Sequence, residues 1–116
     1  MGANAFSPNE LETLLEDAVL LGDGPAAAEL FEPGGVLIPG PRSPQARGRA
    51  AIAAYVHAAS GRPGYLAGSP LTAHSRDIAL LAGPAAINVA RRRTDGSWLF
   101  VISLHGWTAG NRTVES

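Results

Sequence analysis

The sequence predicts a single α+β domain in which helices from the first half pack on one face of an antiparallel sheet from the second half. Its 116 residues suit one domain with one core. Apolar residues recur at helical spacing before residue 61, whereas the chain after residue 70 has the alternation and composition of strands. Asp95-Gly96, between two apolar runs, is a strong hairpin signal.

The first helix is expected to begin at Ser7 and end at Gly22. Ser7 can cap the helix, Pro8 suits the first helical position, and Glu10 completes a capping box. The apolar residues at helical spacing are Leu11, Leu14, Leu15, Ala18 and Val19.

The rest of the first half divides into two more helices, one strand and two loops. A short helix follows residues 23–25, packs through Ala27, Leu30 and Phe31, and ends at residues 33–35. The next expected segments are a strand at 36–39, a loop at 40–48, a helix at 49–60 and a loop at 61–70.

Three strands are expected after residue 70, at 71–82, 85–94 and 97–107. Residues 1–6 and 108–116 are expected to be flexible tails. A two-residue turn at 95–96 sets the register of the last two strands.

This register divides the hairpin into a polar face and an apolar face. The first combines Asn88, Ser103 and His105 with Ala86, Ala90 and Val101. The second carries Ile87, Val89, Phe100, Ile102 and Leu104, with Arg91 and Arg93 near the turn. Periodicity leaves two alternatives open: either the apolar face packs under the helices, or the polar face lines a cavity there and another subunit covers the apolar face.

Charged residues beside the hairpin are interpreted as structural. Arg93 is expected to stack on Trp98, and Asp77 to form a cross-strand ion pair with an arginine.

Composition narrows the possible partners. A net charge of −1 gives no reason to expect nucleic acid, and no segment is apolar enough for a signal peptide or a membrane helix. There is no cysteine, and the three histidines lack the spacing of metal ligands, so neither a metal nor a cofactor is expected. The expected location is the cytoplasm.

Two stretches resemble the NTF2-like superfamily, and in particular its SnoaL-like members. Residues 22–56, GDGPAAAELFEPGGVLIPGPRSPQARGRAAIAAYV, are similar to the helix–strand–helix region of these proteins. Residues 87–105, INVARRRTDGSWLFVISLH, resemble their closing hairpin with its Gly-Ser-Trp turn.

The resemblance implies a curved antiparallel sheet coned over three helices around an apolar pocket. It also implies that Asn88, Ser103 and His105 point into that pocket, which favours the second alternative. The ligand pocket is then expected to consist of Leu15, Val19, Tyr55, Asn88, Ala90, Val101, Ser103 and His105. Because residues 83–96, GPAAINVARRRTDG, run straight from one strand into the last turn, the sheet is expected to have one strand fewer than usual.

Ketosteroid isomerase activity is not expected. By the resemblance, its catalytic base falls on Pro39, its tyrosine on Leu15 and its second oxyanion donor on Asn88. Proline cannot abstract a proton and leucine cannot donate one, so only Asn88 keeps a hydrogen-bonding role.

Three function classes stay open. The first is an isomerase, cyclase or hydrolase for an apolar small molecule, with His105 as the candidate acid–base group. The second is a non-catalytic binder with the same pocket, and the third is an interaction module with a vestigial pocket. A homodimer through Ile87, Val89, Phe100, Ile102 and Leu104 is expected in each case.

Overall fold

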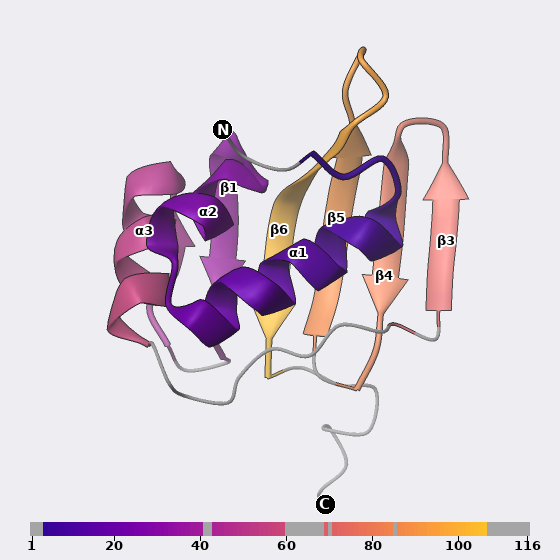
Figure 1. The fold of residues 1–116 in the computed structure, drawn as a ribbon. Helices are drawn as coiled ribbons and strands as arrows, with labels where there is room; N and C mark the ends of the chain where they lie inside the picture. The colour runs from indigo at the N-terminus through magenta and orange to yellow at the C-terminus, as the bar shows by residue number, and fades with distance from the viewer. Residues whose placement is uncertain (1–3, 41–42, 60–68, 70, 85, 107–116) are drawn as a thin grey trace, which may run out of the picture.

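Three helices and a six-stranded sheet make up the part of the chain that the structure describes (Figure 1). This structure is a computed structural model that describes residues 4–40, 43–59, 69, 71–84 and 86–106. The helices are α1 (Pro8–Leu21), α2 (Gly24–Glu29) and α3 (Arg49–Ala58). The strands are β1 (Phe31–Ile38), β2 (Ala46–Arg47), β3 (Leu71–Ser75), β4 (Ile78–Ala82), β5 (Ala86–Arg92) and β6 (Trp98–His105).

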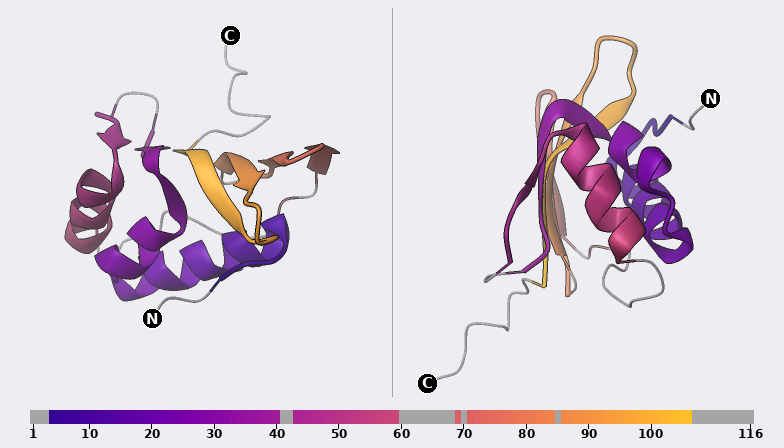
Figure 2. Two further views of the ribbon diagram at one scale, coloured as in Figure 1. Left: turned by 90° about the horizontal axis from the view of Figure 1, so that it is seen from above. Right: turned by 90° about the vertical axis from the view of Figure 1, so that its left-hand side faces the viewer.

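The sheet has the strand order β2-β1-β6-β5-β4-β3 and is mixed. Strands β1 and β6 are parallel, and the other neighbours are antiparallel. The helices lie over one face, which we call the inner face, and no helix of the described residues covers the opposite, outer face (Figure 2). The α+β class is confirmed, whereas a purely antiparallel sheet was a wrong prediction, because β1 and β6 run in the same direction.

Helix α1 begins and ends as the sequence predicts. The Ser7 hydroxyl accepts a hydrogen bond from the Glu10 amide, and Pro8 occupies the first turn. After Gly22, the amide of Asp23 donates to the carbonyl of Ala18 and closes the last turn. The buried residues of this helix face the sheet: Pro8, Leu11, Glu12, Leu15 and Ala18.

Several predicted boundaries are wrong. Phe31 begins β1 instead of ending the second helix, and residues 33–35 lie inside β1, where its register with β6 is irregular. Residues 46–47, predicted as loop, form β2. The segment 71–82 is not one strand, because it folds back at Arg76-Asp77 into β3 and β4. The predicted loop at 61–70 lies outside the described residues except for Ser69.

The β5–β6 hairpin contains two departures from the predicted register. The turn is a three-residue loop, Thr94–Gly96, closed by a hydrogen bond from the Arg93 amide to the Ser97 carbonyl, and Gly96 has a φ of 89°. The register then shifts between Val89 and Ala90, which leaves Val101 as the additional residue of β6. Beyond this bulge, the pairs Asn88–Ser103 and Ala86–His105 form as predicted.

The bulge changes which face of the sheet the β6 side chains nearer the turn occupy. Phe100 pairs with Ala90 and is fully buried, so placing Phe100 on the outer face was wrong. Val101, predicted opposite Ala90, is only half-buried. Phe100 packs instead on Phe31, with ring centroids 5.3 Å apart, in the core between the helices and the inner face.

Candidate functional site

A row of buried polar side chains crosses the apolar inner face. Glu12 projects from α1, Asn88 from β5, and Ser103 and His105 from β6, and all four are buried. Glu12 lies between Leu11 and Leu15 along the helix, within the face that α1 turns to the sheet. The pairing of β5 with β6 places Asn88 directly opposite Ser103, so strand pairing alone brings these two side chains together.

Hydrogen bonds join these residues into one chain. The Asn88 Nδ2 amide donates to Glu12 Oε2 at 3.0 Å, and the Ser103 hydroxyl donates to Asn88 Oδ1 at 2.5 Å. Ser103 Oγ also lies 2.8 Å from His105 Nε2. Ser69 completes the set, because its hydroxyl donates to Glu12 Oε2 at 2.6 Å. We call these five residues the Glu12 network.

The hydrogen bonds of the Glu12 network share one direction. The Asn88 amide nitrogen is a donor, so its oxygen accepts from Ser103. The only proton of the Ser103 hydroxyl is then used, and this oxygen can interact with His105 only by accepting from Nε2–H. Each donor therefore points along the chain towards the Glu12 carboxyl group.

Burial keeps the His105 ring neutral. Desolvation lowers the pKa of His105 from its ordinary 6.5 to about 4, so the imidazole carries no charge at pH 7. The Ser103 contact then places the single proton of this neutral ring on Nε2.

The Glu12 carboxyl group is incompletely satisfied. Its Oε2 accepts two hydrogen bonds, but its buried Oε1 has no hydrogen-bond partner among the described residues. An unsatisfied buried polar atom typically costs about 1–3 kcal/mol, and more when the group is charged. A feature this unfavourable for folding is typical of a binding or catalytic site.

Comparison with solved structures identifies proteins with a similar fold. A domain from Thiobacillus denitrificans, assigned to the calcium/calmodulin-dependent protein kinase type II association domains, matches with a TM-score of 0.68 and 20% identity over 90% of this chain and 99% of that one. An NTF2-like protein with a cystatin-like fold from Novosphingobium aromaticivorans matches with a TM-score of 0.63 and 19% identity, covering 93% and 86% of the two chains.

A ketosteroid isomerase-like protein from Erwinia carotovora atroseptica matches with a TM-score of 0.62 and 20% identity over 81% of this chain and 88% of that one. The chain has the NTF2-like fold. No family model matches the sequence, and no curated protein is significantly similar to it.

The inner face of this NTF2-like fold gathers most of the predicted pocket residues. Asn88, Ser103 and His105 lie together, and Ala90 is fully buried on the same face of β5. Leu15 is fully buried on α1, and Val19 packs against the same core while half-buried.

Two predicted pocket residues lie elsewhere. Val101 is the half-buried residue of the β6 bulge. Tyr55, on α3, is 37% exposed and lines a groove of about 410 Å³. The described residues that line this groove include no member of the Glu12 network. That groove also includes Pro39, the position implied for the catalytic base of ketosteroid isomerase.

Sequence reasoning missed Glu12 and Ser69. Glu12 lies four residues after Pro8 and three before Leu15, so helical spacing places it on the buried face. That signal was available, but a glutamate among leucines is ordinarily assigned to solvent. Ser69 offered no comparable signal, because its contact with Glu12 spans 57 positions of sequence.

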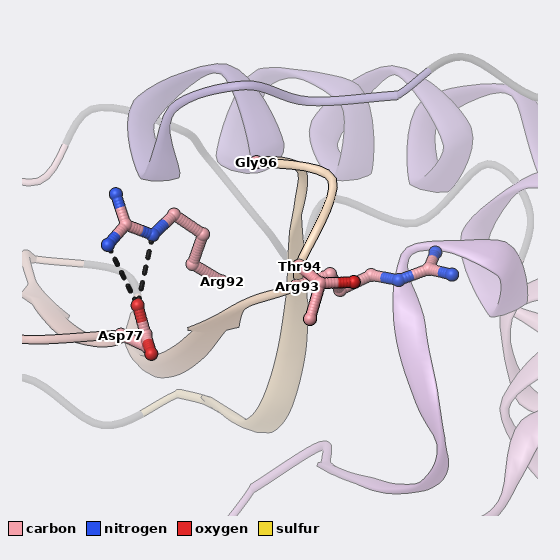
Figure 3. A pocket seen from close by; sticks show the side chains of 5 residues that line it. All are labelled: Asp77, Arg92, Arg93, Thr94 and Gly96. Atoms are coloured by element: carbon pink, nitrogen blue, oxygen red, sulfur yellow. Dashed lines mark hydrogen bonds and ion pairs between the residues drawn. The ribbon is translucent and has the colours of Figure 1, made fainter.

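The turn end of the β5–β6 hairpin carries a separate depression of about 320 Å³, lined by Asp77, Arg92, Arg93, Thr94 and Gly96 (Figure 3). Arg92 donates to Asp77 Oδ1 through Nε at 3.1 Å and Nη2 at 2.8 Å, which is the predicted cross-strand ion pair. Arg92 and Arg93 extend in opposite directions (Figure 3). Arg92, rather than Arg93 as predicted, lies over the Trp98 ring, 5.9 Å from its centroid.

The described residues include neither a metal-binding cluster nor a membrane-spanning helix. They contain no group of three or more His, Cys, Asp or Glu side chains placed to hold a metal ion. No helix in the same part of the chain is long and apolar enough to cross a membrane.

Proposed function

We propose that this protein binds an apolar small molecule against the inner face of its sheet, with the Glu12 network as the polar centre of the site. The observation that carries the proposal is the buried Glu12 carboxyl group, whose Oε1 has no hydrogen-bond partner among the described residues and which projects towards a mostly apolar core. Ligand sites are typically apolar, with a few convergent polar groups that fix the orientation of the ligand. The Glu12 network matches this description.

The same arrangement would serve an enzyme or a carrier. Glu12 and His105 are joined through Asn88 and Ser103, so a proton-accepting group and a titratable ring share one hydrogen-bonded chain. In an enzyme of the SnoaL-like kind, Glu12 rather than His105 would touch the substrate, because the buried Glu12 Oε1 has no partner among the described residues.

A ligand screen by two-dimensional NMR tests the proposal. The probes are polyketide-like, terpenoid and steroid-like molecules, and the reporters are the side-chain amide of Asn88 and the ring of His105. Ile87 and Leu104 are matched controls, because they occupy the same strands but face the opposite way. Binding should shift the two inner-face reporters and leave the methyl groups of Ile87 and Leu104 in place. Shifts confined to the controls, or none for any probe, would remove the proposal.

We also propose that the protein is a homodimer through the outer face of the sheet. Ile87, Val89, Ile102 and Leu104 form two adjacent cross-strand pairs there, all half-buried, and Leu80 beside Val89 is 38% exposed. Apolar patches of this kind on a protein surface typically mark an interface. The similarity to a domain assigned as an association domain is consistent with such a role.

A further inference from the structure

The remaining hydrogen-bonding capacity of the Glu12 network defines what a ligand must offer. The bonds from His105, Ser103 and Asn88 all run towards Glu12, and Ser69 donates to the same carboxyl oxygen. The atom left without a partner among the described residues is Glu12 Oε1, which is an acceptor in a carboxylate. The complementary ligand group is therefore a hydrogen-bond donor.

The distribution of charge narrows the identity of that donor. The ion pairs of the described residues join Arg91 to Glu32 and Arg92 to Asp77, and neither includes Glu12. His105, at the other end of the network, is neutral at pH 7 because its burial lowers its pKa to about 4. Burying a carboxylate without a cation nearby is strongly unfavourable. A ligand that carries a positive charge would supply a counter-ion that the described residues do not provide.

We propose that the ligand of the inner-face site is a small apolar molecule bearing a protonated amine, whose N–H group donates to Glu12 Oε1. This inference rests on the proposed function and specifies the chemical class of the ligand. A ligand carboxylate would place a second negative charge against Glu12, and a ketone would bring a second acceptor to an unused acceptor. An alcohol would satisfy the hydrogen bond but not the charge.

Three probes with the same ring and different head groups separate these possibilities: cyclohexylmethylamine, cyclohexylmethanol and cyclohexanecarboxylate. The amine is protonated at pH 7, as a lysine side chain is. Dissociation constants are measured by NMR titration at pH 7, with the Asn88 side-chain amide as reporter. We expect the wild-type protein to bind the amine roughly ten- to a hundredfold more tightly than the alcohol, and the carboxylate most weakly.

The variant Glu12→Gln keeps the shape of the side chain and removes its charge. We expect it to bind the amine at least about tenfold more weakly than wild type and to bind the alcohol nearly unchanged. The matched control is Glu16→Gln, which makes the same change one turn later on α1, where the side chain is only half-buried. It should retain the wild-type preference for the amine.

The outcomes distinguish this inference from the proposed function. If no probe moves the Asn88 reporter, and the wider ligand screen is also negative, the inner-face site itself is wrong. If the alcohol binds as tightly as the amine to wild type, or Glu12→Gln keeps the preference for the amine, the site stands and the amine assignment is overturned. The comparison of head groups on wild type needs no variant. It therefore tests the amine assignment even if Glu12→Gln does not fold.

Discussion

His105 links the stability of the fold to pH. Its pKa is about 4 in the folded protein, because burial disfavours the charged ring, and 6.5 in the unfolded chain. Between these values the unfolded state binds more protons, so the stability that the neutral ring allows is fully present above pH 6.5 and is lost as pH falls towards 4. We expect the free energy of unfolding in urea to be about 2 kcal/mol lower at pH 5 than at pH 7.

The variant His105→Gln isolates this effect from other titrating groups. Its amide can still donate to Ser103, but it does not titrate between pH 4 and 7. The difference between pH 5 and pH 7 should shrink by most of the 2 kcal/mol estimated above. An unchanged pH dependence in the variant would mean that another group is responsible.

The buried Glu12 carboxyl group is expected to lower the free energy of unfolding of this protein. In Glu12→Gln, the side-chain oxygen still accepts from Asn88 and Ser69, while the cost of burying a charge disappears. We expect the free energy of unfolding at pH 7 to rise by about 1 kcal/mol, as found when strained functional groups are replaced. Thermal and urea unfolding measure the change, with Glu16→Gln as the control. A clear loss of stability specific to Glu12→Gln would show that the carboxyl group is compensated in the free protein.

The contrast between Asn88 and Glu12 shows what residue patterns can predict about the site. Asn88, Ser103 and His105 were predicted together, because the hairpin register follows from local sequence and fixes the facing pairs. Glu12 reaches Asn88 across 76 positions of sequence, from a helix whose docking angle no local pattern specifies. Its burial depends on tertiary packing that overrides the ordinary preference of a carboxylate for water.

At the scale of single elements, the contact between α2 and α3 depends on the absence of a side chain at Gly24. A Cβ atom there would lie 2.3 Å from the Ala53 carbonyl oxygen, and the obstructing atom is backbone. Gly24→Ala should therefore destabilise the protein by about 1–3 kcal/mol, or more if the helices cannot separate. The control is Gly34→Ala in β1, where a Cβ would meet nothing within 4 Å. Urea unfolding of the two variants should differ clearly, and equal stabilities would contradict the close packing of α2 on α3.

The two hairpins show why some elements were predicted better than others. In β5–β6, the additional loop residue near Gly96 and the bulge at Val101 offset each other, so the predicted pairs beyond the bulge are correct. In β3–β4, the turn at Arg76-Asp77 has no glycine, asparagine or proline to mark it. Arg76 adopts a φ of 57°, a conformation that arginine rarely takes. The backbone preference of this residue therefore gives no indication of a turn.

For the whole molecule, the class and the order of elements were predictable, but the sheet order was not. Helical spacing and the hairpin signal were enough to indicate helices on one face of a sheet. The parallel pairing of β1 with β6 joins Val36 to Ile102 and Ile38 to Leu104, residues that are 66 positions apart in both pairs. Pairing over such a distance depends on the complete topology, and it determines which apolar side chains gather on the outer face.

This outer face leads to a prediction about assembly. Val89 lies between Ile102 and Leu80 in the cross-strand pairing, so an arginine there would place a charge at the centre of the apolar surface. If the outer face forms a dimer, the wild-type chain should sediment as a dimer at micromolar concentrations. Val89→Arg should sediment as a monomer, because a buried unpaired charge strongly opposes association. Its circular dichroism spectrum should be unchanged. The matched control is Leu21→Arg, which introduces the same charge at an exposed position of α1 on the other side of the sheet and should stay dimeric. A monomeric wild-type protein, or a Val89→Arg variant that remains dimeric, would show that the outer face is not the interface.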